Sequence, residues 1–283
     1  MPRGISPRRP AKTGRHEGAR AVPRARLVPS PAGGRDLRPV QPGRSLPGKT
    51  TATVTRSKYN PVAQERVSEI LKRLDQLYPG VTCALTHRNA WELLVATILS
   101  AQSTDVRVNM VTPEIFKKYP TVQDFAALKP EQLEPDIRST GFFRNKSKSV
   151  VGAAKKIVSD FGGEVPSEMD QLLTLPGVAR KTANVVLGTW FKKNEGVVVD
   201  THVYRISRRL ELTRHDDPKK IEQDLMKIIP REKWTDFAHQ VIWHGRKLCI
   251  ARRPNCADCL LENICHAADK TWSTVETHKS AKP

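Results

Sequence analysis

Apolar residues recur at helical spacing along most of the chain after residue 60. In the first such stretch they lie on one face of a helix until Pro79-Gly80 ends the pattern. The dipeptide in front of it, Asn60-Pro61, joins a residue that is common at N-caps to one that is common at the first helical position. We therefore expect a helix that starts at this dipeptide and carries on one face Val62, Val67, Ile70, Leu71, Leu74 and Leu77.

The same helical period continues through the rest of the chain. No stretch shows sustained strand alternation, apart from the short β-branched run at 197–199. The longest apolar stretches, such as 93–99, are far too short to cross a bilayer, so no membrane span is expected. The pattern predicts an all-α protein, with further helices over residues 91–101, 106–119, 145–161, 179–191, 201–212, 218–229 and 232–250.

Residues 1–57 lack this pattern and carry most of the excess charge. They hold 13 Lys and Arg, two acidic residues, nine prolines and seven glycines, which amounts to +11 of the formal net charge of +19. Such a segment buries too little apolar surface to offset its ordering entropy, so a disordered basic tail is predicted. It either raises non-specific affinity for polyanions or is a solvated extension without a role. A transit peptide is a third interpretation, which the prolines disfavour.

Four of the five cysteines lie close together, at Cys249, Cys256, Cys259 and Cys265. The chain shows no apolar signal-peptide core, which favours a reducing compartment and metal binding over a disulfide scaffold. The C-x6-C-x2-C-x5-C spacing contains one C-x2-C knuckle, whereas zinc sites usually pair two. The spacing thus favours an iron-sulfur cubane and leaves zinc as the alternative. Cys83 stands alone and is expected to be a buried core thiol.

Residues 171–184 predict a helix, a tight turn at Pro176-Gly177 and a second helix. The turn presents unpaired backbone N–H groups and the positive end of the second helix dipole, which together suit a phosphate and read no base. Leu-Pro-Gly is also a common helix terminator. A plain structural turn is therefore the alternative.

Lys181 lies just inside this second helix, and Asp200 follows the apolar run at 197–199. A lysine on a helix is usually a solvated charge, and an aspartate in this place is usually an N-cap. A chemical role requires both residues. A partly desolvated amine becomes nucleophilic at neutral pH, and a nearby carboxylate takes up its proton or stabilises a developing cation.

Together the hairpin Leu-Pro-Gly-Val-Ala-Arg-Lys-Thr-Ala, the segment Val-Asp-Thr-His and the cysteine spacing resemble the endonuclease III family, over about residues 60–268. Members are bifunctional DNA glycosylases and abasic-site lyases. The resemblance implies two helical lobes with DNA bound across the cleft between them. One lobe is a six-helix barrel at 80–197 that contains the hairpin. The other combines 58–79 with 198–268 and a 4Fe-4S cluster, and residues 269–283 would form a C-terminal tail.

The resemblance also implies the chemistry. Lys181 would attack C1′ of a flipped-out nucleotide and form a Schiff base, with Asp200 assisting, so that oxidised pyrimidines are removed and the strand is cut by β-elimination. Gln102 and Phe142 would fill the hole in the duplex, and the cluster would hold a basic loop in place. Ala179 stands where the family often has a second glycine. The expected DNA contacts besides the two wedges are Gly177, Ala179, Arg180, Arg252 and Arg253.

The expected partner is double-stranded DNA with damaged pyrimidines or abasic sites, bound by a monomer without membrane association. The expected location is the bacterial cytoplasm or nucleoid, or the nucleus or mitochondrion of a eukaryote. Three other interpretations remain. An adenine-specific mismatch glycosylase usually lacks the lysine and carries an extra C-terminal domain. A non-catalytic DNA-binding module would have no use for Lys181 and Asp200, and an electron-transfer protein would explain neither the hairpin nor the charge.

Overall fold

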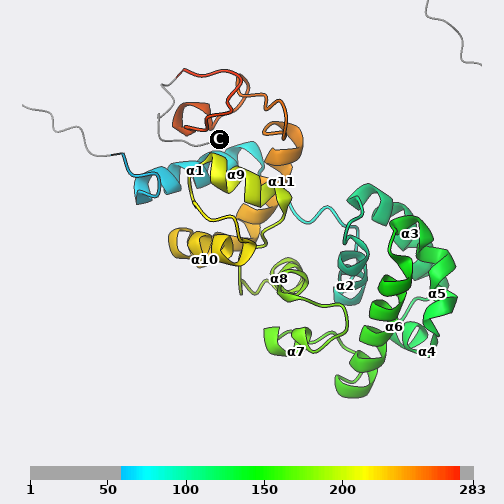
Figure 1. Cartoon of the computed structure of the whole chain (residues 1–283). Helices are drawn as coiled ribbons and strands as arrows, with labels where there is room; N and C mark the ends of the chain where they lie inside the picture. Colours follow the sequence, from blue (N-terminus) through cyan, green and yellow to red (C-terminus); the bar gives the residue numbers. More distant parts are fainter. Residues whose placement is uncertain (1–58, 275–283) are drawn as a thin grey trace, which may run out of the picture. The chain divides into compact units, whose positions relative to one another are not determined.

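Helices form all of the regular secondary structure in residues 59–274, which are the residues that this computed structural model describes (Figure 1). The predicted all-α class is thus confirmed. None of these helices has both the length and the apolar character that a membrane crossing needs. The predicted tail at 1–57 lies outside the described residues, as do residues 275–283 of the predicted C-terminal tail. In chain order the α-helices are α1 (Gln64–Leu77), α2 (Ala90–Leu99), α3 (Asp105–Lys118), α4 (Val122–Ala127), α5 (Pro130–Ile137), α6 (Phe143–Asp160), α7 (Met169–Leu173), α8 (Arg180–Thr189), α9 (Thr201–Arg209), α10 (Pro218–Ile228) and α11 (Trp234–Lys247).

The start of α1 differs from the prediction. The helix begins at Gln64, and its N-cap is Ala63 rather than Asn60. The Asn60 side chain accepts a hydrogen bond from the N–H of Val62 at 3.1 Å, and its carbonyl accepts one from Ala63 at 3.2 Å. Asn readily closes such a local turn with the backbone two residues on, which competes with capping a helix. The expected N-cap was therefore wrong, because Asn60 forms a turn ahead of the helix.

The short helices α4 and α5 were not predicted individually, and α7 is the short first helix of the hairpin expected at 171–184. They contain only five to eight residues, so each has too few apolar positions for a helical period to stand out. Local capping marks α4 instead. The hydroxyl of Thr121 accepts from the N–H of Asp124 at 3.2 Å, and the Asp124 carboxylate accepts from the N–H of Thr121 at 2.9 Å. The β-branched run at 197–199 forms no strand.

One hydrophobic cluster is built from helices α2 to α8. Helix α2 contacts α3, α6 and α8, and nine of its ten residues are buried. The rings of Trp91 and Phe125 meet edge to face at 5.3 Å between centroids, which joins α2 to α4. Because residues on nearly all sides of α2 are buried, the position of Leu99 is fixed, and so is the start of the loop that follows it.

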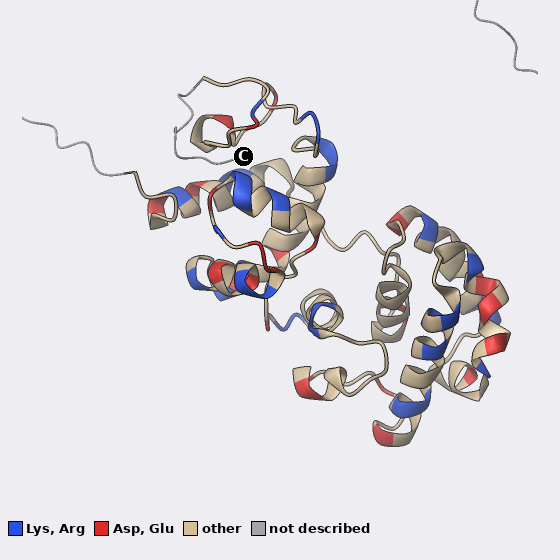
Figure 2. Cartoon of the chain, viewed as in Figure 1, with Lys and Arg blue, Asp and Glu red and all other residues tan. Residues whose placement is uncertain are grey.

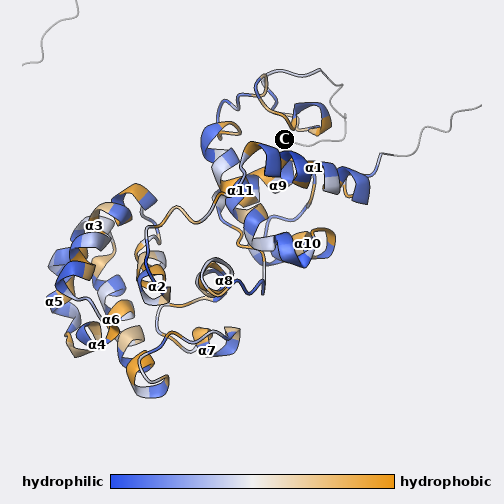
Figure 3. Cartoon of the chain, turned by 180° about the vertical axis from the view of Figure 1, so that it is seen from behind, coloured by the Kyte–Doolittle hydropathy of each residue, from blue (hydrophilic) through white to orange (hydrophobic). Residues whose placement is uncertain are grey.

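A second hydrophobic cluster is built from α1, α9, α10 and α11. Helix α9 buries Val203 and Ile206 on one face, and α11 buries Phe237 and Val241. Figure 3 shows hydrophobic and hydrophilic residues alternating along most of the helices, as a helix with one buried face requires. The existence of two clusters agrees with two helical lobes, while the expected lobe boundaries stay a prediction.

Candidate active site and cysteine loop

A cavity of about 590 Å³ brings three of the predicted site residues together. Lys181 from α8, Asp200 ahead of α9 and Gln102 after α2 all line it. Residues of both hydrophobic clusters contribute to its walls, among them Val185 and Ile242. Phe142, the hairpin residues Gly177 to Arg180, and the pair Arg252 and Arg253 are not part of this lining.

The hairpin before Lys181 rests on α6. Gly177 has a φ of 77°, and a Cβ at this position would overlap the side chain of Ser149, so only glycine fits. Gly152, one turn further along α6, lies close to Pro176, where an added Cβ would come within 3.2 Å of the proline ring. The N-cap of α8 is Ala179, whose side chain makes no capping hydrogen bond. The first turn of α8 therefore presents backbone N–H groups that no side chain of its N-cap occupies.

Asp200 is the N-cap of α9, as the capping interpretation of its position predicts. Its Oδ1 atom accepts hydrogen bonds from the N–H groups of His202 and Val203, both at 2.8 Å. Among residues 59–274, no hydrogen bond or ion pair engages its Oδ2 atom. The cap therefore fixes the carboxylate at the cavity wall and leaves one oxygen for chemistry.

Gln102 and Phe142 share an unusual backbone. Their φ angles are 54° and 49°, in the left-handed region that non-glycine residues rarely adopt. Both side chains are exposed, and Phe142 is 62% exposed although it is aromatic. The ring of Phe143 next to it lies 5.8 Å from the guanidinium carbons of both Arg138 and Arg144. Two cations thus flank the half-buried ring next to the exposed Phe142, a feature that sequence reasoning missed.

Arg180, a predicted DNA contact, is engaged within the protein. Its Nε atom donates to both carboxylate oxygens of Glu222, at 3.1 and 3.3 Å, and Nη2 donates to the carbonyl of Glu195. Asn184, one turn along α8, donates to the same carboxylate at 3.0 Å. The guanidinium therefore joins α8 to α10, and its contact with DNA stays a prediction.

Basic residues gather at the end of α11 and in the loop that follows it (Figure 2). Arg246 is paired with Asp105 at 2.5 Å, and Lys247 lies over the ring of Trp243 at 5.0 Å. Arg252 and Arg253 are exposed, and neither has an ion-pair partner in the described part of the chain. Of these cations, the last two are the freest to meet a phosphate.

The four clustered cysteines, Cys249, Cys256, Cys259 and Cys265, line one cavity. None of them forms a disulfide. Within residues 59–274, no three His, Cys, Asp or Glu side chains converge on the position of a single metal ion. Burial raises the pKa of the Cys259 thiol to about 12, so a bound cation is needed to hold its thiolate at neutral pH. Four sulfurs around one shared space are a suitable donor set for a group larger than a single ion.

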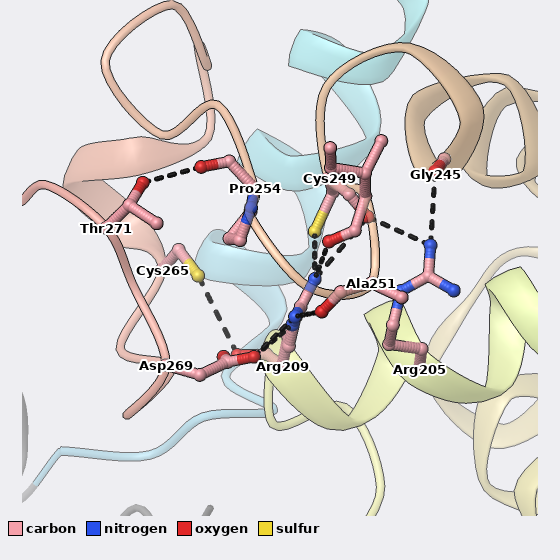
Figure 4. A network of polar contacts seen from close by, with 10 residues as sticks. Arg205, Arg209, Gly245, Cys249, Ala251, Pro254, Cys265, Asp269 and Thr271 are labelled. Atoms are coloured by element: carbon pink, nitrogen blue, oxygen red, sulfur yellow. Dashed lines mark hydrogen bonds and ion pairs between the residues drawn. The ribbon is translucent and has the colours of Figure 1, made fainter. Parts of the chain in front are cut away.

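Arg209 holds the start of this cysteine loop (Figure 4). Its Nη1 atom donates to the sulfur of Cys249 at 3.2 Å and to the carbonyl of Ile250 at 2.9 Å. Its Nη2 atom donates to the carbonyl of Ala251 at 2.9 Å and pairs with Asp269. One guanidinium on α9 thereby fixes three successive residues at the first cysteine.

Arg205, one turn earlier on α9, binds the same segment. It donates to the carbonyls of Gly245 and Cys249 at 3.1 and 2.9 Å (Figure 4). Sequence analysis did not single out Arg205 or Arg209. The signal available was their spacing of four on the helix that Asp200 caps, which places both on one face. The same helix therefore carries the candidate carboxylate at its start and the contacts to the cysteine loop further along.

His244 lies between the second cluster and the cysteines. It is 2% exposed, and its Nδ1 and Nε2 atoms lie 3.1 Å from the Tyr78 hydroxyl and 3.6 Å from the Cys259 sulfur. Burial, and then the charge of Arg205, lower its pKa to about 4, so the ring is neutral at neutral pH. Burial raises the pKa of Tyr78 to about 12, so its hydroxyl keeps its proton as a donor.

Comparison with known proteins identifies the group to which the chain is related. Residues 95–231 match the family described as HhH-GPD superfamily base excision DNA repair protein. Endonuclease III of Synechocystis is 54% identical over 205 residues, which cover 72% of this chain and 94% of that protein. The chain belongs to the endonuclease III family. Endonuclease III of Bacillus subtilis is 42% identical over 207 residues, 73% of this chain and 94% of the relative.

A solved structure also resembles this member of the endonuclease III family. It is described as a trapped covalent intermediate of endonuclease III and DNA, in an estranged-adenine complex. It has a TM-score of 0.68 and 43% sequence identity, and it covers 72% of this chain and 95% of its own.

Proposed function

We propose that this protein removes oxidised pyrimidines from duplex DNA and then cuts the strand by β-elimination through a Schiff base at Lys181. Base-excision glycosylase and abasic-site lyase activities are those of the endonuclease III family, to which the chain belongs. The observation that carries the assignment of residues is the shared cavity. The primary amine of Lys181, the carboxylate of Asp200 with its free oxygen, and Gln102 all line this cavity.

The proposed chemistry uses one amine twice. With the nucleotide flipped into the cavity, Lys181 Nζ forms a bond to C1′ while the bond from C1′ to the base breaks, and the base leaves with the electron pair. The Oδ2 atom of Asp200 accepts the proton that the amine loses and offsets positive charge on the sugar. The bond between C1′ and the ring oxygen O4′ then breaks, O4′ takes the proton held by Asp200, and an iminium forms between C1′ and Lys181 Nζ.

The iminium makes strand cutting possible without a metal. It acidifies C2′, and loss of a C2′ proton is accompanied by cleavage of the bond between C3′ and its oxygen, so the 3′ phosphate departs. Water later releases the lysine. The trapped covalent intermediate described for the endonuclease III relative supports a covalent route in this family.

The proposed DNA surface combines wedges and phosphate contacts. Gln102 and Phe142 have exposed side chains and strained backbones. Such side chains are suited to insert into the gap that the flipped nucleotide leaves in the base stack. Gly177 and Ala179 would offer backbone N–H groups to one phosphate. Arg252 and Arg253 would meet others, with Arg180 contributing if Glu222 releases it. These contacts read no base and make binding strongly salt dependent.

A 4Fe-4S cluster is the proposed cofactor of the four cysteines. They line one cavity, and the Cys249 sulfur accepts a hydrogen bond from Arg209, a set that fits a thiolate-ligated cluster. Each iron of such a cluster takes one cysteine thiolate. In the proposed reaction the cluster has no step, and it would hold the loop of Arg252 and Arg253 in position. The bacterial relatives support action on the DNA of a bacterial nucleoid, and we propose that the protein acts as a monomer.

Borohydride trapping tests the proposed function. The wild-type protein is incubated with duplexes that carry thymine glycol or an abasic site, beside Lys181→Gln and the matched variant Lys219→Gln, whose lysine is exposed on α10. We expect a covalent adduct with wild type and Lys219→Gln and none with Lys181→Gln. DNA binding without any adduct in the wild type would instead identify a monofunctional glycosylase or a non-catalytic module.

A further inference from the structure

Lys146 is a buried lysine that the proposed chemistry does not use. It lies in the first turn of α6 and is 4% exposed. Its Nζ atom donates to the carbonyl of Leu99 at 2.8 Å and to the carbonyl of Thr140 at 2.7 Å. In the described part of the chain, no carboxylate pairs with it. A charged group has thus been buried against two backbone oxygens alone.

Both carbonyls belong to helix ends. Leu99 is the last residue of α2, and Thr140 is the last residue of the 3₁₀ turn at Arg138–Thr140. The last carbonyls of a helix lack partners within it and carry partial negative charge, which favours a cation there. Burial lowers the pKa of Lys146, so the two carbonyls compensate only part of the cost of removing the ammonium from water. A residue held at such a cost is expected to have a positional role.

The two carbonyls have one further property in common. Gln102 lies three residues after Leu99, and Phe142 lies two residues after Thr140. These are the two exposed side chains on left-handed backbone described above. Strained turns keep their conformation only when their surroundings hold them. A single ammonium anchors the base of both turns, although the two segments are about forty residues apart in the sequence.

We propose that Lys146 is a positioning residue that fixes the Gln102 turn and the Phe142 turn relative to each other, so that both side chains enter the duplex together. This inference rests on the proposed function of those two residues as wedges. Lys146 is 4% exposed and does not line the cavity that holds Lys181 and Asp200. Its loss should therefore impair insertion into duplex DNA and leave the Schiff-base chemistry of Lys181 unaffected.

The test compares substrates that do and do not have a base stack to invade. Lys146→Met, Lys146→Arg and the control Lys148→Met, an exposed lysine on the same helix, are trapped with borohydride on an abasic duplex and on the same abasic strand alone. We expect Lys146→Met to react about tenfold more slowly on the duplex and at an unchanged rate on the single strand. Lys146→Arg keeps charge and donors and should recover part of the duplex rate.

A spectroscopic readout reports insertion directly. With 2-aminopurine placed opposite the abasic site, wild type should raise the fluorescence as the base unstacks, and Lys146→Met should not. In a background of Gln102→Ala and Phe142→Ala, the substitution at Lys146 should have no further effect, because its action passes through those residues. If Lys146→Met does not fold, Lys146→Gln, which keeps N–H donors without the charge, takes its place in every comparison.

The outcomes separate this inference from the function on which it rests. Equal slowing on duplex and single strand would show a general effect on folding and overturn the positioning role. So would an unchanged duplex rate, or a full effect of the Lys146 substitution in the Gln102→Ala, Phe142→Ala background. Absence of any adduct with the wild-type protein would overturn the proposed function itself.

Discussion

Gln102 and Phe142 lie about forty residues apart in the sequence and have the same left-handed backbone, with φ angles of 54° and 49°. Neither is glycine or asparagine, the residues that adopt this conformation at low cost. Each such residue costs about 1 to 3 kcal/mol, which the surrounding structure must offset. Among the described residues, four non-glycine residues have such a backbone, and Gln102 and Phe142 are the two of them that are proposed to enter DNA; the others are Lys192 and Glu211.

Replacement of Phe142 by glycine should separate stability from DNA binding. Glycine relieves the left-handed strain, and the ring that it removes is 62% exposed, so the free energy of unfolding should stay unchanged or rise by up to about 1 kcal/mol. Affinity for abasic duplex DNA should fall about tenfold. Thermal melting and fluorescence anisotropy measure the two effects.

Lys192→Gly is the matched control for Phe142→Gly. Lys192 has a φ of 57° and is not among the residues proposed to contact DNA, so glycine should relieve the same strain there without removing a wedge, although it also removes a hydrogen bond to the carbonyl of Thr189 at 2.8 Å. Equal losses of affinity in the two variants would argue against a wedge role for Phe142.

Gly177→Ala should disrupt the hairpin more than strain alone explains. The new Cβ would overlap Ser149 of α6 and would also require a φ of 77°, so we expect a loss of about 2 to 4 kcal/mol in the free energy of unfolding. Gly80→Ala is the control, because Gly80 has a φ of 64° and nothing within 4 Å of its added Cβ. It should cost about 1 kcal/mol. Chemical denaturation compares them, and equal costs would show that the packing against Ser149 is not limiting.

Parts of this site could be predicted because they are encoded locally. The spacing of the four cysteines, the Pro176-Gly177 turn and the aspartate ahead of α9 each occupy a short segment with a recognisable pattern. Lys181 and Asp200 are only nineteen positions apart, within two such segments. The helices with long apolar periods were predicted for the same reason.

Other parts of the site depend on contacts that no local sequence pattern predicts. The pair of Arg246 with Asp105 and the anchoring of Leu99 by Lys146 join residues far apart in the chain. The left-handed backbone of Gln102 has no signal in its residue type. At Asn60 the error is the opposite one, because a local pattern predicted a feature that does not form. A residue that is common at N-caps forms a turn instead of a helix cap. Tertiary packing decided these positions.

Arg209→Met should loosen the cysteine loop. Methionine keeps much of the side-chain volume but removes the donors to the Cys249 sulfur and to the carbonyls of Ile250 and Ala251, and it leaves Asp269 unpaired. In cluster-loaded protein we expect faster loss of the absorbance near 400 nm in air and weaker binding of undamaged duplex. Arg208→Met is the control, because Arg208 pairs with Asp216 and makes no contact with the cysteines. Equal rates of bleaching in the two variants would contradict the role of Arg209.

His244 should make the protein less stable as the pH falls from about 6.5 to about 4. Burial lowers its folded pKa to about 4, while the unfolded chain titrates near 6.5, so between these values only the unfolded state gains the proton. Above pH 6.5 the effect vanishes, and below pH 4 it reaches its limit of about 3 kcal/mol. The groups that face the ring are Tyr78, Cys259 and Arg205.

His244→Asn tests this sign. The variant loses packing and should be less stable than wild type at pH 7.5, but the difference between the two should shrink as the pH falls toward 4.5, because asparagine does not titrate. Melting temperatures are compared at equal absorbance near 400 nm at each pH, so that loss of a cluster is not counted as unfolding. Because burial also lowers the pKa of His239, that residue contributes the same slope to both proteins and cancels in the difference. A stability difference that stayed constant from pH 7.5 to 4.5 would show that His244 titrates alike in the folded and unfolded states, and that its burial beside Cys259 does not keep it neutral.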